Sequence, residues 1–487
     1  MNLTGLAFAA FLAVVLIVYW CLPRRASFQN SVLLAASYLF YLSWSPEWLL
    51  LLLTATAVDW TVARLIEGDR RAARARRLLL GVSIAANVGA LFWFKYRAFF
   101  ADSAAQLLTS IGVTASAPLL ELVLPIGLSF YTLIKIGYVL DVYYGRVPAC
   151  RSPLTFATFV AFFPQIIAGP ITRAGSMLAQ LEKPRRLSTA LIGSASAALL
   201  LGWFMKAYIA DWIAQTLVDP VFAAPGTQGP IAHWLGLLGY AVQVFCDFAG
   251  YSLLAIGVGR LFGIELPPNF DRPFLSRSMP ELWRRWHISL NTWLFDYLYG
   301  PWVTARGMLH GRIATTLVIV FALSGLWHGA RWTFVLWGVL HGFALAAHHW
   351  WDVWYRGRCR IDRRWVTARK SVPYALAALV LAQGWFLASL VLFRAPDLDA
   401  SLSYLQGMLG AGSGFHVPVD EIFLVNLLVA FGFVLIHHLE GVRLGARLRE
   451  RFDALPAPVH GVTFGLVIVW LLIFAPLARG TFIYAQF

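Results

Sequence analysis

Two histidines stand in stretches that otherwise carry mostly apolar and aromatic side chains. His328 lies in SGLWHGARWTFVLWGVLHG, residues 324–342, and His287 lies in SRSMPELWRRWHISLNTWLFDYLYGP, residues 276–301. Histidine has an ordinary pKa of about 6.5, so a neutral ring can take a proton from a hydroxyl group near neutral pH. Burial disfavours the charged form and keeps the ring ready to act as a base. Both rings are therefore candidate catalytic groups.

Cations and aromatic side chains surround His287. Arg284 and Arg285 precede it in the chain, and guanidinium groups bind phosphates through charge-assisted hydrogen bonds. The alternative is an amphipathic helix lying in the headgroup region of a membrane, because Trp, Tyr and Arg all suit that interface. For His328 the alternative is a core histidine that is hydrogen-bonded to a carbonyl of a neighbouring helix.

Three further residues attract attention without a clear role. His341 follows His328 by thirteen residues, which in one continuous helix is more than three turns, so a packing role is expected for it. Asp247 stands next to Cys246 in an apolar run, and a buried acid needs a partner. It could orient a histidine or lock helices together. An acyl-enzyme at Cys246 lacks a visible adjacent base.

The composition places these residues in a membrane protein. Of 487 residues, 59% are hydrophobic and 13% are charged, whereas a soluble globular chain carries roughly 25% charged residues. We therefore predict an all-α integral membrane protein, since apolar runs of about 20 residues form spanning helices. The four cysteines lie far apart without a CxxC pair, which predicts neither a disulfide framework nor a zinc site.

Twelve segments approach the length that a membrane span requires, and we predict about a dozen transmembrane helices in a single domain, residues 1–487. Some segments are short or long for a simple crossing, and 155–170 is broken by Pro164 and Pro170. Irregular backbone at membrane depth must be packed in protein or line a wet cavity, so we expect re-entrant segments around an internal cavity. The segments are 4–22, 31–44, 48–65, 78–94, 124–143, 189–213, 232–262, 313–327, 331–349, 372–393, 422–438 and 459–477.

The charged residues predict an orientation. The net charge is +15, and basic residues cluster in alternate loops, which include 70–77, 356–370 and 443–451. The loops between them, such as 397–421, are acidic or uncharged. This alternation predicts basic loops in the cytoplasm and the N-terminus outside. Because the charge is clustered in these loops, membrane orientation explains it better than nucleic-acid binding.

Five motifs follow one another along nearly the whole chain. They are LPIGLSFYTLIKIGYVLDVYYG (124–145), FFPQIIAGPITR (162–173), NFDRPFLSRSMPELWRRWHISLNTWLFDYLYGP (269–301), SGLWHGARWTFVLWGVLHG (324–342) and FIYAQF (482–487). In sequence and order they resemble the bacterial branch of the membrane-bound O-acyltransferase (MBOAT) family, and within it the members that O-acetylate alginate. The resemblance implies many helices around a central tunnel in the plasma (inner) membrane. It places the essential family histidine at His328 and the upstream family histidine at His287.

The activity implied by the resemblance is O-acyl transfer. An acyl group, with acetyl the first expectation, would move from a cytoplasmic thioester to a hydroxyl acceptor on the outer side, modifying a secreted or cell-surface polysaccharide. His328 would act as the base, with Gly325 and Gly329 leaving room for substrate. The indole N–H groups of Trp327 and Trp332 could stabilise charge on the carbonyl oxygen. The residues expected to bind substrate are Arg284, Arg285, Trp327, Asn291 and Asp296.

The expected donor is acetyl-coenzyme A or an acyl thioester on a carrier protein, with no bound cofactor and no metal. Its phosphates would need paired cations near Arg284, Arg285 and His287. Besides the lipid bilayer, the expected partners are a periplasmic or extracellular acyltransferase partner or the polysaccharide acceptor itself. Nucleic acid is not expected.

The acyl group and the acceptor stay open. Phe295 stands before Asp296 where the family usually has Arg, and Leu253 replaces a family acid. The enzymatic alternative is transfer of D-alanyl or another acyl group from a carrier protein to a teichoic-acid-like polymer or a lipid. The non-enzymatic alternative is a scaffold or transporter of a polysaccharide export complex.

Overall fold

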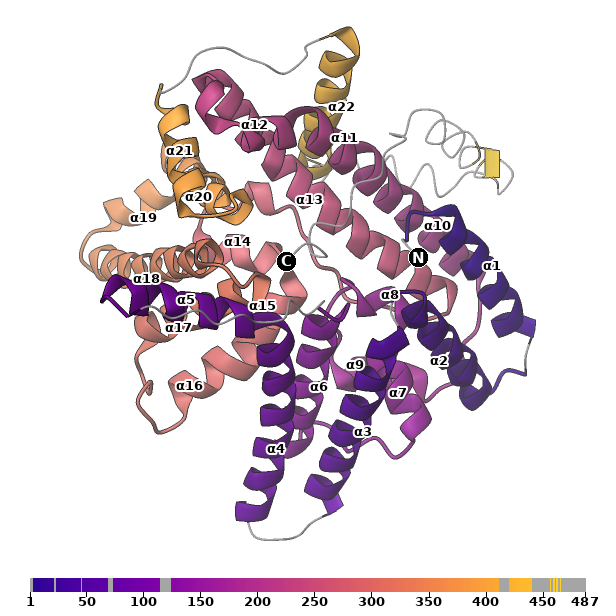
Figure 1. The fold of residues 1–487 in the computed structure, drawn as a ribbon. Helices are drawn as coiled ribbons and strands as arrows, with labels where there is room; N and C mark the ends of the chain where they lie inside the picture. Colours follow the sequence, from indigo (N-terminus) through magenta and orange to yellow (C-terminus); the bar gives the residue numbers. More distant parts are fainter. Residues whose placement is uncertain are drawn as a thin grey trace. The chain divides into compact units, whose positions relative to one another are not determined.

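The computed structural model describes residues 3–21, 23–44, 46–68, 73–113, 124–410 and 420–439, with positions 456, 459, 461, 462 and 465. In these residues all regular elements are helices (Figure 1). Five helical segments are long and apolar enough to cross a membrane: Pro46–Gly68, Ala73–Ser110, Thr189–Ala223, Pro230–Leu261 and Val372–Arg394. The predicted all-α membrane fold is confirmed. The number of spans stays a prediction, and the expected span 459–477 lies largely outside the described residues.

Contacts between residues divide the chain into two compact units. Unit 1 comprises Met1–Leu199 and Ser252–Pro267, and unit 2 comprises Leu200–Tyr251 and Pro268–Phe487. Helix α13 (Pro230–Leu261) contributes residues to both units. The expectation of a single domain stays a prediction.

Unit 1 contains a group of three helices, α3, α4 and α6, that pack against one another (Figure 1). An ion pair is buried among them. Lys135 Nζ lies 3.2 Å from Asp59 Oδ2, and Ser83 and Asn87 donate hydrogen bonds to the same carboxylate. These bonds offset the cost of removing the two charges from water. The helices of the unit are α1 (Leu6–Cys21), α2 (Ala26–Leu42), α3 (Pro46–Gly68), α4 (Ala73–Leu91), η1 (Phe92–Tyr96), α5 (Arg97–Ser110), α6 (Leu128–Tyr143), α7 (Pro153–Ala161), α8 (Phe163–Ile166), α9 (Ala174–Leu181) and the start of α10 (Thr189–Trp203).

The segment broken by proline has an irregular backbone, whereas its predicted re-entrant path in a membrane stays a prediction. Helix α7 ends at Ala161, Phe162 leaves the helical region, and the single turn α8 ends at Ile166. The backbone N–H of Phe163 donates to Ser37 Oγ at 3.1 Å. Residues 159–172 are all buried, so protein covers the irregular backbone, as membrane depth demands.

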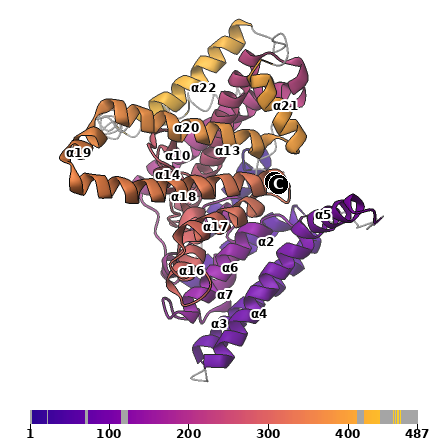
Figure 2. The ribbon, with the colours of Figure 1, turned by 90° about the vertical axis from the view of Figure 1, so that its left-hand side faces the viewer.

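Unit 2 is built around a hairpin of two helices, α17 and α18, with α20 packed against α18 (Figure 2). Helix α17 ends at His328, and α18 begins at Trp332. Helix α14 also packs on α18. The further elements are η2 (Phe204–Ala210), α11 (Asp211–Ile213), η3 (Ala214–Val218), α12 (Asp219–Ala223), η4 (Pro225–Thr227), η5 (Pro273–Leu275), α14 (Met279–Arg285), α15 (Ile288–Leu294), η6 (Phe295–Tyr299), α16 (Gly300–Thr304), α17 (Ile313–His328), α18 (Trp332–Ile361), α19 (Arg363–Lys370), α20 (Val372–Arg394), α21 (Leu398–Met408) and α22 (Glu421–Leu439).

Glycines bring the two helices of this hairpin into backbone contact. A methyl group at Gly325 would overlap the carbonyl oxygen of Phe334, and one at Gly338 would overlap the carbonyl oxygen of Phe321. A methyl group at Gly329 would overlap the Phe334 ring. The expectation that Gly325 and Gly329 leave room for substrate is therefore wrong. Residues of α18 fill the space beside both glycines. Membrane helices need small residues where their backbones approach closely.

Candidate active site

A break in the helical backbone places His287. Helix α14 ends at Arg285, Trp286 is extended, and His287 has a left-handed φ of 45° before α15 begins at Ile288. Among the described residues, the only non-glycine residues with positive φ are His287 and Arg272. Such a backbone costs about 1–3 kcal/mol and persists where the surroundings impose it, most often at functional sites.

The surroundings that impose this turn are contributed by Asn269. Its carbonyl oxygen accepts a hydrogen bond from the Ile288 N–H at 2.9 Å, and its Oδ1 accepts one from the Ser289 hydroxyl at 2.6 Å. The N–H of Asp271 donates to the Arg285 carbonyl at 2.9 Å. The segment before α14 thus holds both sides of the turn.

The turn brings His287 next to His328. Their ring centroids are 6.4 Å apart, and the side chains belong to segments that lie 41 positions apart in the sequence. The ring of Trp327 lies 6.1 Å from that of His287 and 5.0 Å from that of His328. The ring of Phe248 lies 4.5 Å from that of His287. His287 is 1% exposed and His328 is 4% exposed. The two candidate catalytic rings therefore form one buried pair.

His328 is held at the end of a helix among aromatic rings. It is the last residue of α17, as the short predicted segment 313–327 suggested. Trp337 of α18 and Phe393 of α20 each lie 5.3 Å from its ring. Three helices thus fix the orientation of the imidazole, which a base needs in order to meet a proton at a defined position.

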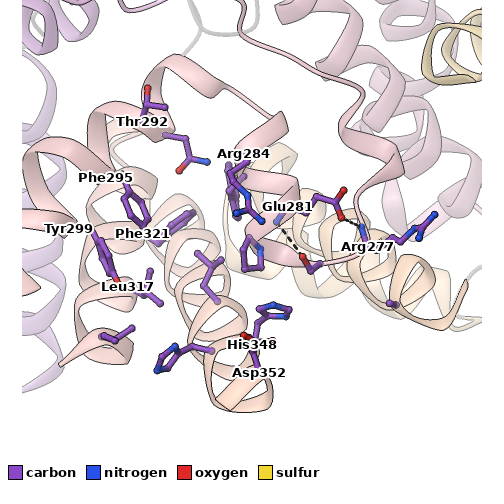
Figure 3. A pocket seen from close by; sticks show the side chains of 18 of the residues that line it. Arg277, Glu281, Arg284, Thr292, Phe295, Tyr299, Leu317, Phe321, His348 and Asp352 are labelled. Carbon is purple, nitrogen blue, oxygen red and sulfur yellow. Dashed lines mark hydrogen bonds between the residues drawn. The ribbon is translucent and has the colours of Figure 1, made fainter. Parts of the chain in front are cut away.

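Unit 2 contains a cavity of about 850 Å³ (Figure 3). The residues that line it come mainly from α14, α15, η6, α17, α18, α19 and α20. Trp283 and Phe321 line the cavity and lie 5.0 Å apart. On its other side, Trp283 contacts Trp337, which in turn contacts His328. Neither His287 nor His328 lines the cavity, so the expected continuous tunnel past both rings stays a prediction.

The cavity wall is rich in cations. Asp352 pairs with Arg356 and with Arg369, the latter at 3.1 Å. Partial burial acts to raise the pKa of Asp352, but these hydrogen bonds and charges hold it below its ordinary value. Arg277 and Arg284 line the cavity and make no ion pair within the described part of the chain. They remain available for an anion.

The structure separates the predicted substrate-binding residues into two sets. Arg284, Asn291 and Asp296 line the cavity. Trp327 instead packs against both histidines. Arg285 is not among the lining residues, and its guanidinium pairs with Glu281 at 2.8 Å.

Sequence reasoning missed the contribution of α18 and α19 to the cavity. His348 and His349 line it, although the sequence assigned them no role. The available signal was spacing, because His348, Asp352 and Arg356 recur every four residues and so share one helix face. The basic segment 356–370, interpreted only as an orientation signal, supplies two of the lining arginines.

Comparison with known proteins decides the family. Residues 150–389 match the profile of the membrane-bound O-acyltransferase family. The chain is 36% identical over 423 residues to a probable alginate O-acetylase, AlgI, of Azotobacter vinelandii, covering 86% of this chain and 80% of the relative. The chain belongs to the MBOAT family. Two more distant relatives are a peptidoglycan O-acetyltransferase of Helicobacter pylori (34% identity, 84% of this chain and 79% of the relative) and a teichoic acid D-alanyltransferase of Streptococcus thermophilus (31%, 49% and 59%).

This membership makes the chain an O-acyltransferase, as predicted, and removes the scaffold and transporter alternatives. The matched region contains His287, His328 and all of the residues that line the cavity. The roles of individual residues stay predictions.

His341 lies close to the histidine pair of this acyltransferase. The expectation of three intervening turns assumed one continuous helix, and that assumption is wrong because α17 and α18 form a hairpin. The ring of Trp337 contacts both His341, at 4.8 Å, and His328. His341 Nε2 lies 2.9 Å from Ser389 Oγ.

The buried acid Asp247 has the partner that the sequence analysis required. Lys206 Nζ lies 2.5 Å from Asp247 Oδ1 and 2.7 Å from Asp211 Oδ1, and all three residues are at most 3% exposed. Lys206 stands in η2, a π-helical segment that displaces it from ordinary helical register. Asp247 precedes Phe248, which packs on His287, so the triad anchors the part of α13 that supports the site.

Burial of His287 makes the stability of the folded protein sensitive to acid. It lowers the pKa of His287 from 6.5 to about 3, so the unfolded chain binds a proton between these values and the folded chain does not. The stability due to the neutral ring is present above pH 6.5 and declines as the pH falls toward 3. We expect acidification from pH 7 to 5 to cost the wild type about 2 kcal/mol more than His287→Gln. Thermal unfolding in detergent at both pH values measures this, and equal acid sensitivity would contradict it.

Proposed function

We propose that this O-acyltransferase moves an acetyl group from a cytoplasmic thioester donor to a hydroxyl on the outer side of the plasma membrane, in the modification of a secreted or cell-surface polysaccharide. The donor is acetyl-coenzyme A or an acetylated carrier protein. The observation that carries the proposal is the arginine-lined cavity in the unit that contains the buried histidine pair. The names of the alginate and peptidoglycan O-acetylating relatives support acetyl as the group and a polysaccharide as the acceptor.

The cavity suits a phosphate-bearing donor. Its volume of about 850 Å³ lies within the range of roughly 300–1,000 Å³ typical of small-molecule sites. Arg277 and Arg284 offer charge-assisted hydrogen bonds to phosphate oxygens. Arg356 and Arg369 come from a segment whose charge favours the cytoplasm, which is where thioester donors are made. The same charge rule favours an N-terminus on the outer side.

The chemistry at the histidine pair balances without a cofactor. His328 takes the proton of the acceptor hydroxyl as its oxygen attacks the thioester carbonyl carbon. The tetrahedral intermediate collapses, the carbon–sulfur bond breaks, and the leaving thiolate takes the proton back from His328. An ester and a thiol result, and the neutral base is restored. His287, beside His328, faces the same intermediate.

The donor proposal predicts an effect of Arg284. We expect Arg284→Ala to raise the KM for acetyl-coenzyme A about 10- to 100-fold with a smaller change in kcat, because it removes hydrogen bonds to a charged group worth about 1.5–3 kcal/mol. The effect should shrink as salt is raised, since Arg284 is exposed and salt screens exposed charges. Kinetics with purified enzyme and a soluble oligosaccharide acceptor measure both.

Two matched variants test whether the cavity is responsible. Arg360→Ala removes the same charge from the end of α18, where the side chain is exposed and does not line the cavity. Arg285→Ala removes a guanidinium that pairs with Glu281. Both should leave the donor KM within about twofold of wild type. An unchanged KM in Arg284→Ala would place donor binding elsewhere.

A second candidate is transfer of D-alanyl or another acyl group from a carrier protein to a teichoic-acid-like polymer or a lipid. The similarity to a teichoic acid D-alanyltransferase favours it, but that similarity covers about half of the chain. Mass spectrometry of cell-surface glycans from wild-type and deletion strains separates the candidates, because acetyl and D-alanyl esters differ in mass.

A further inference from the structure

A strongly basic segment joins α18 to α20. Residues 356–370 carry seven basic side chains and one acidic side chain. Two of the arginines pair with Asp352 in the cavity wall, whereas the other five cations form no ion pair within the described residues. The acidic side chain, Asp362, caps α19 by accepting a hydrogen bond from the Arg364 N–H at 2.8 Å. The protein thus leaves most of this positive charge without a counter-charge.

This segment lies next to a helix that can span a membrane. Helix α20, Val372–Arg394, is long and apolar enough for a crossing, and it begins two residues after Lys370. Figure 2 shows α19 at the end of α18, where it joins that helix to α20. The lipid headgroups begin where the hydrocarbon core ends. The basic segment therefore lies at the level of the headgroups.

Exposed apolar side chains accompany the cations on α18. Residues three and four positions apart share a helix face, and one such face contains Trp351, Trp354, Arg358 and Ile361. All four are exposed, Ile361 by 82%. The guanidinium carbon of Arg358 lies 5.4 Å from the centre of the Trp354 ring. Tryptophan and arginine together suit the boundary between hydrocarbon and headgroups.

Aromatic contacts fix α19 against α18. The ring of Trp365 lies 5.4 Å from that of Trp354 and 5.7 Å from that of Tyr355. The Tyr355 hydroxyl donates a hydrogen bond to the Trp365 carbonyl. Arg363 and Lys370 are both exposed, and because they stand seven positions apart they share one face of α19. The cations are thus held on a fixed platform, which lowers the entropy lost on binding.

We propose that this segment binds the headgroup of an anionic phospholipid. The residues that form the site, which we name the tryptophan–arginine elbow, are Trp351, Trp354, Arg358, Ile361, Arg363 and Lys370. Its three cations bind the phosphate through charge-assisted hydrogen bonds, and its apolar side chains contact the upper part of the acyl chains. A zwitterionic headgroup carries its own cation, so it matches the elbow less well. The proposal is independent of the acyl donor and of the acceptor.

An acidic soluble protein would also match the charge of the elbow. The apolar side chains favour lipid, because they are exposed beside a candidate span. At that level they bury their surface in the bilayer without a second protein, as in helices that lie in a membrane interface. The two partners differ in the experiment that follows, since one is a lipid and the other remains in solution.

The test titrates the full-length protein in neutral detergent with phosphatidylglycerol that carries pyrene on one acyl chain. Energy transfer from tryptophan to pyrene reports binding, and phosphatidylcholine with the same chains is the reference. We expect the wild type to bind phosphatidylglycerol about 10- to 100-fold more tightly, because each cation near an anionic lipid contributes about fivefold in affinity. The triple variant Arg358→Gln, Arg363→Gln, Lys370→Gln should lose this preference. Raised salt should weaken it in the wild type.

The control variant Arg24→Gln, Arg25→Gln, Lys183→Gln removes three exposed cations of unit 1. It should keep the preference of the wild type, and both triple variants should unfold at the wild-type temperature because the changed side chains are exposed. The inference is overturned if the wild type does not distinguish the two lipids, or if the elbow variant keeps the preference. Loss of binding to an acidic carrier protein in the elbow variant, with the lipid preference unchanged, would assign the elbow to a soluble partner.

Discussion

We expect replacement of His328 with glutamine to lower the rate of acyl transfer by about 10²- to 10⁴-fold, the usual contribution of a positioned general base. Glutamine keeps a polar side chain of similar reach but cannot take a proton at neutral pH. Because the proposed base acts on the acceptor hydroxyl, donor binding should change little. Ester formation in membranes and donor affinity in detergent measure the two effects.

The control for this prediction is His310→Gln, which changes an exposed histidine in the loop before α17. It should retain full activity. Because His328 packs against Trp337 and Phe393, the amount and thermal stability of each variant must be recorded with its activity. Acyl transfer at the wild-type rate by a folded His328→Gln enzyme would rule out His328 as the general base.

We expect replacement of Lys206 with methionine to destabilise the protein by about 3–5 kcal/mol, the typical cost of leaving a buried charge without its partner. Methionine preserves much of the volume of the side chain but removes the cation between Asp211 and Asp247. We expect less protein in the membrane and a lower unfolding temperature in detergent. Because Asp247 adjoins Phe248, which packs on His287, the remaining folded protein should also lose activity.

The triple variant Lys206→Met, Asp211→Asn, Asp247→Asn distinguishes charge imbalance from loss of packing. Removing all three charges should recover part of the lost stability, since the uncompensated carboxylates are then gone. The single variant Lys183→Met, which changes an exposed lysine, should unfold like the wild type. A Lys206→Met protein as stable as the wild type would show that the triad has no anchoring role.

The membrane character of this protein is a property of composition and periodicity, which the sequence carries in full. Runs of apolar residues must form helices in lipid, because no other local structure satisfies their backbone groups. The break at Pro164 and the early end of α17 at His328 were also visible in the sequence. Proline lacks the N–H that a continuing helix requires, and 313–327 is too short for a full crossing.

The pairing of His287 with His328 could not be predicted from spacing. It depends on the left-handed turn at His287, which Asn269 stabilises from a distant position in the chain. The same holds for Lys206, whose importance appears only when α13 brings Asp247 to it. Sequence reasoning recognised that the buried acid needed a partner but had no means of identifying it.

The roles of the glycines, of His341 and of α18 were decided by tertiary structure alone. Gly325 and Gly329 resembled an opening for substrate, yet α18 fills that space. His341 was set aside because distance was counted along one helix, whereas a hairpin returns the chain to Trp337 and His328. Local sequence specifies helices because their hydrogen bonds are local. Which side chains meet depends on how these helices pack, and packing is set by residues far apart in the chain.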